Sequence, residues 1–170
     1  MNIQENVPLS AHSTMRLGGP ARYFVEVNDK NDVASAVAWA KSKNLPVIMI
    51  GSGSNIVWSD QGFSGLVIAD KIMRFEKYEE DSENVYITVG GGENWDKVVK
   101  RCVEEGLTGI EALSLIPGTA GATPVQNVGA YGQEIAQTLV SVEAYSLDDD
   151  KFVTIQNVDC GFGYRTSRFK

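Results

Sequence analysis

The sequence predicts an α+β protein made of two α/β subdomains, one covering residues 1–70 and the other residues 71–170. Two observations lead to this prediction. Short apolar runs typical of strands are interspersed with two amphipathic segments typical of helices. After residue 70, the continuous apolar runs give way to a run in which apolar and charged residues alternate, which places the boundary near Asp70.

The first subdomain begins with a segment, residues 7–20, that reads as irregular and ends in a Gly-Gly-Pro turn. Residues 21–27 are rich in aromatic and β-branched side chains and read as a strand. Asn28 or Asp29 can cap a helix that runs to about residue 42, and its apolar residues have helical spacing.

Two continuous apolar runs follow, LPVIMI at residues 45–50 and GLVIA at residues 65–69. Runs of this kind suit strands that are buried on both faces of a parallel sheet. The first subdomain is therefore predicted to be a βαββ unit with parallel pairing.

The second subdomain is predicted to contain strands at residues 72–78 and 85–89 and a helix at residues 93–105. Residues 139–155 read as a hairpin with three aspartates at its tip. The apolar face predicted for the helix consists of Trp95, Val98, Val99, Cys102 and Val103.

Composition excludes several classes of function. A net charge of −7 argues against a nucleic-acid binder, which needs a basic surface. No apolar run is long enough to span a membrane, and the N-terminal residues lack the pattern of an export signal, so we expect a cytoplasmic protein. Cys102 and Cys160 are expected to be reduced, buried thiols, and His12, the only histidine, predicts no metal site.

A glycine-rich turn, GSGSN at residues 51–55, follows the apolar run 45–50. Small residues let backbone N–H groups approach and hold a phosphate without lysines. A Rossmann turn is disfavoured, because Ile56 stands where a third glycine is expected and the following residues do not read as a helix. A plain tight turn between two strands explains the motif equally well.

The stretch IPGTAGATPVQNVGAYG, residues 116–132, carries four glycines, two prolines and no charge. So many helix breakers exclude a core helix, and the neutral amide side chains suit hydrogen bonds to a flat heteroaromatic ring. An ordered structural loop is the alternative, and we favour ligand binding over it.

The sequence resembles the UDP-N-acetylenolpyruvoylglucosamine reductases over essentially its whole length. The resemblance rests on STMRLGGPA at 13–21, GSGSN at 51–55, GGGENW at 90–95, the stretch 116–132, and GFGYRTSRFK at 161–170. It implies the FAD-binding module of the vanillyl-alcohol-oxidase flavoproteins.

The resemblance also implies roles for individual residues. Arg165 is implied to be catalytic and to bind the substrate carboxylate, with Tyr131 and Tyr164 also binding substrate. From the residues alone, a surface arginine in a salt bridge is the better explanation of Arg165, and Tyr131 could equally be a packed aromatic. The residues implied to bind FAD are Gly51, Ser52, Gly53, Ser54, Asn55, Pro117, Gly118, Ala122, Thr123, Gln126, Asn127 and Gly129.

The reaction that the resemblance implies has two halves. NADPH reduces the bound flavin, and the enolpyruvyl ether of UDP-N-acetylglucosamine then takes a hydride at its vinyl carbon and a proton at the neighbouring carbon. The product, UDP-N-acetylmuramate, is a precursor of peptidoglycan, which connects the activity to cell-wall biogenesis, cell shape and cell division.

Members of this family continue well beyond the length of the present sequence, with a substrate-binding domain, a proton-donating serine and a late glutamate. No residue here matches these, so the 170-residue chain is expected to be inactive alone. Two other functions were weighed: a different FAD oxidoreductase with a related module, and a stand-alone FAD-binding or storage module.

Overall fold

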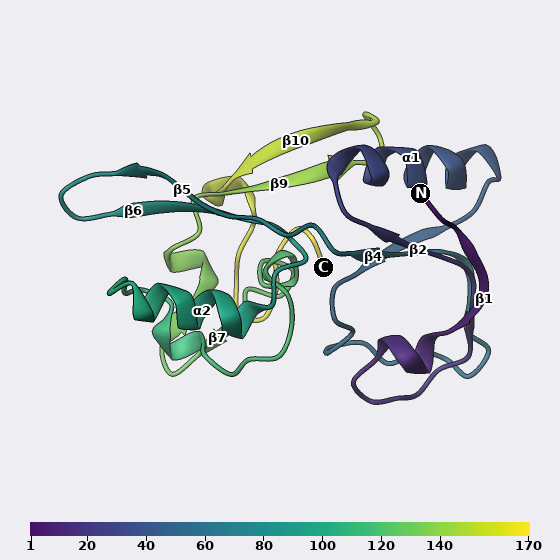
Figure 1. Ribbon diagram of the computed structural model, residues 1–170, viewed down its shortest axis with the longest axis horizontal. Helices are drawn as coiled ribbons and strands as arrows, with labels where there is room; N and C mark the ends of the chain where they lie inside the picture. The colour runs from purple at the N-terminus through teal and green to yellow at the C-terminus, as the bar shows by residue number, and fades with distance from the viewer. The chain divides into compact units, whose positions relative to one another are not determined.

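The computed structural model describes the backbone of residues 1–170 and every side chain except those of Glu79 and Glu80. It has the predicted α+β architecture, in which helices pack against several small sheets. The chain divides into two compact units (Figure 1). The first comprises Met1–Ile72 with the hairpin tip Leu147–Lys151, and the second comprises Met73–Ser146 and Phe152–Lys170.

The first unit is built on a four-stranded sheet with the order β1-β2-β4-β3. Strands β2 and β3 both run parallel to β4, which confirms the predicted parallel βαββ unit. Strand β1 pairs antiparallel with β2, and its last two residues, followed by a short 3-10 helix at Leu9–His12, lie in the segment 7–20 that reads as irregular from sequence, so the first part of that prediction is wrong. The strands are β1 (Gln4–Pro8), β2 (Pro20–Val27), β3 (Val47–Ile50) and β4 (Phe63–Asp70).

Strand β3 corrects one expectation about burial. The run LPVIMI predicts a strand buried on both faces, but β3 lies at the edge of the sheet, and the Met49 side chain is 47% exposed. Strand β4, by contrast, lies between β2 and β3, and its residues 65–69 are all buried. The central position of β4 explains the difference, because only an inner strand has neighbours on both sides.

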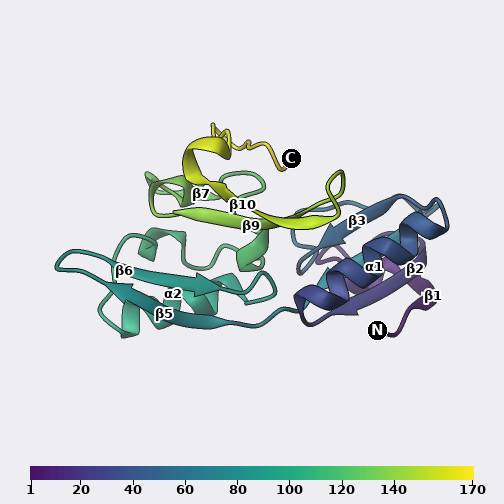
Figure 2. The same cartoon turned by 90° about the horizontal axis from the view of Figure 1, so that it is seen from above.

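Helix α1 (Lys30–Ser42) covers one face of this sheet, as Figures 1 and 2 show. The Asp29 side chain caps its N-terminus by accepting a hydrogen bond from the backbone N–H of Asp32 at 2.8 Å, as predicted. The apolar positions Val33, Val37 and Ala40 are buried, which confirms the predicted face.

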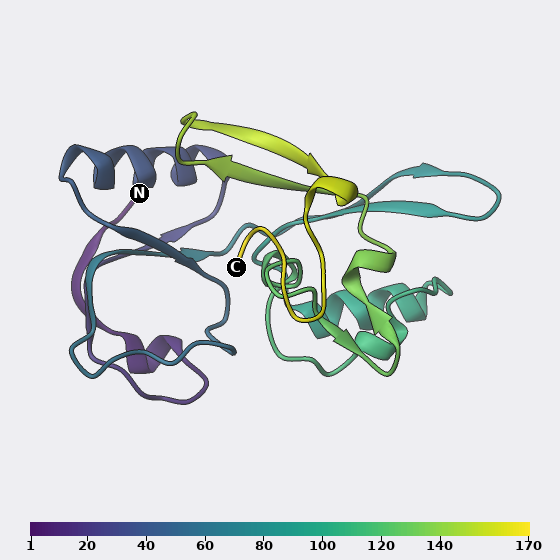
Figure 3. The same cartoon turned by 180° about the vertical axis from the view of Figure 1, so that it is seen from behind.

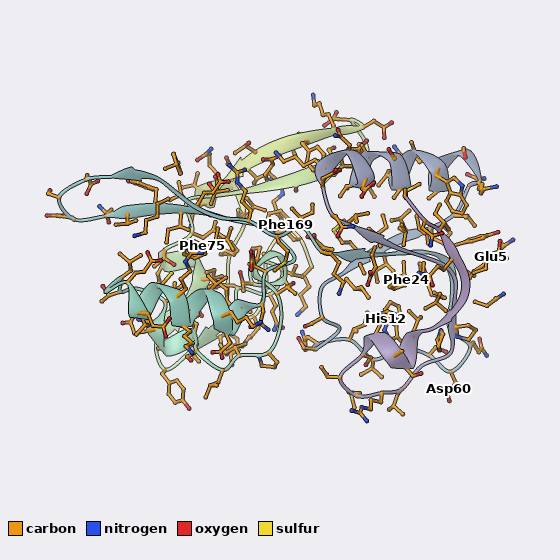
Figure 4. The ribbon with its side chains drawn as sticks, viewed as in Figure 1. Glu5, His12, Phe24, Asp60, Phe75 and Phe169 are labelled. Atoms are coloured by element: carbon orange, nitrogen blue, oxygen red, sulfur yellow. The ribbon has the colours of Figure 1, made fainter. Side chains whose placement is uncertain are left out.

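The opposite face of the sheet packs on the short 3-10 helix η1 (Leu9–His12). Leu9, Phe24 and Trp58 form the centre of this core. His12 stacks on Phe24 with ring centroids 4.2 Å apart (Figure 4). Burial lowers the pKa of His12, opposed in part by the charge of Glu26, so this histidine is a neutral aromatic packing residue at pH 7.

The second unit contains three small antiparallel pairs and one α-helix. The strands predicted at 72–78 and 85–89 are observed at Phe75–Glu80 and Val85–Val89, where they pair antiparallel, and the hairpin predicted at 139–155 is present. Within the described residues, no helix is long and apolar enough to cross a membrane. The elements are β5 (Phe75–Glu80), β6 (Val85–Val89), α2 (Trp95–Glu104), η2 (Glu111–Leu113), η3 (Ala120–Ala122), β7 (Gly129–Ala130), β8 (Gln133–Glu134), η4 (Ile135–Gln137), β9 (Ser141–Ser146), β10 (Lys151–Gln156) and η5 (Asn157–Asp159).

Helix α2 begins after Asn94, whose side chain accepts the backbone N–H of Lys97, and ends before Gly106, which has φ +75°. Four of its five predicted apolar positions are buried. The fifth, Val103, is 51% exposed, so its assignment to the buried face is wrong. Cys102 and Cys160 are buried free thiols, and burial raises the pKa of each.

The first turn of α2 also fixes the start of the glycine-rich loop. The Asp96 carboxylate accepts hydrogen bonds from the Leu115 backbone N–H at 2.7 Å and the Ser114 hydroxyl at 2.9 Å. Both bonds lower the pKa of Asp96 below its usual value, and the bond from Leu115 has the larger effect. The ionised carboxylate therefore stabilises the folded state above about pH 4, and this stabilisation is lost as pH falls through the lowered pKa.

We expect Asp96→Asn to lower the free energy of unfolding at pH 7 and to bring the variant closer to the wild type below about pH 3. The asparagine keeps an acceptor oxygen but lacks the charge that strengthens both bonds. Denaturant unfolding at a series of pH values measures this. A difference from wild type that is the same at pH 7 and pH 3 would contradict the assigned role.

Candidate functional site

The glycine-rich turn at residues 51–55 belongs to the first unit and follows β3 directly. Residues 51–62, all of which the structure describes, are irregular and contain no helix. A Rossmann turn would place a helix N-terminus immediately after the glycines. The structure thus confirms that this is not a Rossmann site.

Gly53 in this turn is needed by the protein's own packing. Its φ is +68°, and a Cβ built on it would lie 2.0 Å from the carbonyl oxygen of His12. The backbone N–H of Thr14 donates to the Gly53 carbonyl at 3.2 Å. The absence of a side chain at Gly53 therefore serves close contact with residues 12–14.

The composition of the turn fits a pyrophosphate. Ser52 and Asn55 are exposed, all five residues are small or neutral, and Gly51 and Ser54 are half-buried. A phosphate bound here would meet neutral donors and no carboxylate within the turn. Ser13, next to His12, carries a buried hydroxyl oxygen that has no hydrogen-bond partner among the residues whose side chains the structure describes.

The loop at residues 116–132 lies in the second unit and is ordered by backbone hydrogen bonds. Trp95 N–H donates to the Gly118 carbonyl, and the N–H groups of Ala120 and Gly121 donate to the carbonyls of Glu93 and Gly91. The GGGENW segment that precedes α2 therefore pairs with the first half of this loop. Among the predicted FAD-binding residues, Pro117 is exposed, and Gly118, Ala122, Gln126 and Gly129 are half-buried.

Two predicted FAD-binding residues of this loop use their side chains internally. Thr123 is buried, and its hydroxyl donates to the Ala120 carbonyl at 2.8 Å. Asn127 is 1% exposed, and its carboxamide bonds to Glu134, Gly163 and Ala136. The Asn127 carboxamide thus has both donors and its acceptor in use within the protein, and the Thr123 hydroxyl has its single donor in use.

The second unit also contains a pocket of about 240 Å³ that collects the predicted substrate residues. Tyr131 and the consecutive residues Tyr164 and Arg165, more than thirty positions further along the chain, all contribute to its lining. The pocket lining comprises Gly129, Ala130, Tyr131, Gly132, Gln133, Glu134, Gln137, Tyr164 and Arg165.

The C-terminal segment (yellow in Figure 3) carries Arg165, whose guanidinium contacts the backbone of β7. The Arg165 guanidinium donates to the Gly129 carbonyl at 2.6 Å and lies 5.3 Å from the centroid of the Tyr164 ring. Tyr131 is 96% exposed and has φ +50°, so the alternative that it is a packed aromatic is wrong. Tyr164 is 84% exposed, so both tyrosine rings are accessible to a ligand.

Sequence reasoning missed three polar residues of this pocket, Gln133, Glu134 and Gln137. Glu134 caps η4 together with Gln137, and Gln133 bonds to the Ala112 N–H and to Glu111. The spacing of Glu134 and Gln137, three residues apart as in a capping box, is a signal in the sequence that could have pointed to these residues. Within the described residues, no group of three or more His, Cys, Asp or Glu side chains could hold a metal ion.

Residues 21–156 match the protein family described as FAD binding domain. A curated UDP-N-acetylenolpyruvoylglucosamine reductase from Thermobifida fusca is 46% identical over 99% of this chain and 48% of the relative. One from Streptomyces avermitilis is 42% identical over 100% of this chain and 46% of the relative. The chain thus spans about half the length of the curated relatives it matches.

Solved structures agree with these relatives. The UDP-N-acetylenolpyruvylglucosamine reductase from Thermus caldophilus superposes with a TM-score of 0.80 at 28% identity, covering 100% of this chain and 58% of that one. A vanillyl-alcohol-oxidase-type flavoprotein from Myceliophthora thermophila gives a TM-score of 0.59 at 17% identity over 78% of this chain and 26% of that one, and so shares the fold. The chain therefore belongs to the FAD binding domain family, has a fold of the vanillyl-alcohol-oxidase type, and resembles UDP-N-acetylenolpyruvoylglucosamine reductases along its whole length.

Proposed function

We propose that the chain is the FAD-binding part of the reductase that converts UDP-N-acetylglucosamine enolpyruvate to UDP-N-acetylmuramate, with NADPH as hydride donor. The observation that carries this proposal is the pocket in which Arg165, Tyr131 and Tyr164 gather beside the loop 116–132. The names of the relatives agree with it. The product would serve peptidoglycan synthesis in the cytoplasm, and thereby cell-wall biogenesis, cell shape and cell division.

In this proposal the two units are the two FAD-binding subdomains. Residues 51–55 hold the pyrophosphate through backbone N–H groups and the side chains of Ser52, Ser54 and Asn55. Residues 117–129 bind nearer the ring system, mainly through backbone atoms, because Thr123 and Asn127 use their side chains internally. The bound flavin supplies the hydride chemistry, and the protein positions the reactants and stabilises charge.

Arg165 is proposed to bind the carboxylate of the enolpyruvyl group. Negative charge develops toward this carboxylate during reduction, and a nearby guanidinium stabilises it. A guanidinium has five N–H donors, and the bond to the Gly129 carbonyl uses only one of them. That bond fixes the guanidinium plane, which prepares its other donors for a two-pronged contact. The exposed rings of Tyr131 and Tyr164 would contact the remainder of the substrate.

The proposal is tested by following the flavin absorbance of a full-length reductase that contains this chain. We expect NADPH to bleach the visible flavin bands, and the enolpyruvyl UDP-sugar to restore them with formation of UDP-N-acetylmuramate, detected by mass spectrometry. Flavin that is bleached but not restored by the UDP-sugar would favour a different FAD oxidoreductase. Bound flavin that NADPH does not reduce would favour a binding or storage module.

A further inference from the structure

Asn127 is the most deeply buried polar side chain near the candidate site, with 1% of its surface exposed. Its side-chain nitrogen donates to the Glu134 carboxylate at 2.8 Å and to the Gly163 carbonyl at 3.1 Å. Its side-chain oxygen accepts the backbone N–H of Ala136 at 3.2 Å. Both donors of the carboxamide and its acceptor are thus used within the protein.

The three partners of Asn127 lie on two segments that form the pocket. Glu134 lines the pocket, and Ala136 follows it in η4. Gly163 begins the turn that carries Tyr164 and Arg165, and this turn is closed by reciprocal backbone bonds between Gly163 and Thr166 at 3.1 and 3.2 Å. Asn127 therefore joins the turn that carries Arg165 to the segment that contains Glu134 and Ala136.

Gly129 lies in close contact with the Arg165 guanidinium. A Cβ built on Gly129 would lie 3.0 Å from an Arg165 guanidinium nitrogen and 2.8 Å from the Glu134 Cγ. The Gly129 carbonyl accepts a hydrogen bond from the same guanidinium at 2.6 Å. Arg165 itself has φ +54°, a conformation that a non-glycine residue adopts only when its surroundings impose it.

We propose that Asn127 is a positioning residue that holds the Arg165 turn against Gly129 and Glu134, and that its side chain does not bind the flavin. This inference rests on the function proposed above, in which Arg165 binds the substrate carboxylate. A carboxamide is suited to the role because it alone offers two donors and an acceptor in one rigid plane, without a charge that would compete with the substrate for Arg165.

Asn157 offers a matched control in the same unit. Its side-chain nitrogen likewise makes two hydrogen bonds, in this case both to backbone carbonyls, those of Ala136 at 2.8 Å and Leu139 at 2.7 Å. These bonds join η5 to the segment around η4 and do not reach the turn at residues 163–166. A substitution of Asn157 removes two comparable bonds without releasing Arg165.

The test uses the FAD-loaded full-length reductase with Asn127→Ser, Asn157→Ser and Arg165→Lys, alone and in pairs. We expect Asn127→Ser to retain FAD and to be reduced by NADPH at nearly the wild-type rate. Its reoxidation by the UDP-sugar should slow about 10- to 100-fold, as for loss of an oriented transition-state contact. The pair Asn127→Ser with Arg165→Lys should be little slower than Arg165→Lys alone, because both changes remove the same contact. Asn157→Ser should change reoxidation by less than about twofold.

Several outcomes overturn the inference. One is that Asn127→Ser weakens FAD binding while the flavin that stays bound is reoxidised at the normal rate. Another is that the effects of Asn127→Ser and Arg165→Lys on the reoxidation rate multiply in the double variant. The third is that Asn157→Ser slows reoxidation as much as Asn127→Ser does. If Asn127→Ser does not fold, Asn127→Gly, which accommodates the φ of +49° at this position and removes both donors without adding a charge, is measured in its place and judged by the same outcomes. Unchanged reoxidation in Arg165→Lys alone would instead overturn the proposed function.

Discussion

Replacing Gly53 with alanine is expected to destabilise the first unit strongly and so to abolish FAD binding. The new Cβ would lie 2.0 Å from the His12 carbonyl oxygen, a backbone atom that cannot move independently of η1. A left-handed φ of +68° adds about 1–2 kcal/mol for a residue with a Cβ, and overpacking adds about 1–3 kcal/mol. Together these two contributions are a large part of the free energy of unfolding of a typical domain, which is about 5–15 kcal/mol. Denaturant unfolding and FAD titration measure the two effects.

Gly106→Ala is the matched control for the backbone term. Gly106 has a similar φ of +75°, but a Cβ there would have no neighbour within 4 Å. Gly106→Ala should therefore lower the free energy of unfolding only by the cost of a left-handed φ, about 1–2 kcal/mol. If Gly53→Ala is no more destabilising than Gly106→Ala, the explanation by the close approach of the His12 carbonyl to Gly53 is wrong.

Because Gly53 is required for folding, the phosphate assignment needs a substitution that leaves the fold intact. Ser52 is exposed in the same turn, so Ser52→Glu adds a negative charge without a packing conflict. Repulsion of the pyrophosphate should raise the Kd for FAD about tenfold or more. Ser35→Glu, an exposed serine on α1, should leave the Kd unchanged, and equal effects of the two would move the phosphate site elsewhere.

Patterns that depend on near neighbours in the sequence predicted most of the fold. The cap at Asp29, the strand at 85–89 and the stop at Gly106 each arise from residues within one or two turns of chain. Burial was predicted less well, because it depends on partners that are distant in sequence. An apolar run such as LPVIMI reads alike in an inner strand and in an edge strand, and only the sheet order decides that Met49 is exposed.

The candidate site shows the same limit. The composition of residues 116–132 indicated a ligand-binding loop, and the resemblance singled out Arg165 and Tyr131. The sequence could not distinguish a side chain that faces a ligand from one that supports the loop. The resemblance implied that Asn127 binds the cofactor, yet its hydrogen-bond partners lie 7, 9 and 36 residues away in the chain, so its burial follows from tertiary contacts.

Arg165→Lys is expected to slow reoxidation of the reduced flavin by the UDP-sugar by about one to three orders of magnitude in the full-length reductase. The lysine keeps the positive charge. It has one nitrogen, which cannot both bond the Gly129 carbonyl, as the guanidinium does at 2.6 Å, and present two coplanar donors to a carboxylate. FAD binding should be almost unchanged, because the proposed pyrophosphate site lies in residues 51–55, and reduction by NADPH should fall less. Stopped-flow absorbance resolves the two half-reactions.

Arg168→Lys is the control for this prediction, since Arg168 lies in the same C-terminal segment and its guanidinium also donates to a backbone carbonyl, that of Asp159 at 3.1 Å. Arg168 is exposed and does not line the pocket, so its replacement should leave both half-reactions within about twofold of the wild type. Slowing confined to Arg165→Lys and to reoxidation is the result that assigns the guanidinium to the substrate carboxylate. If NADPH reduction collapses while reoxidation stays normal, or if FAD is lost, Arg165 is a cofactor or structural residue and its assignment to the substrate fails.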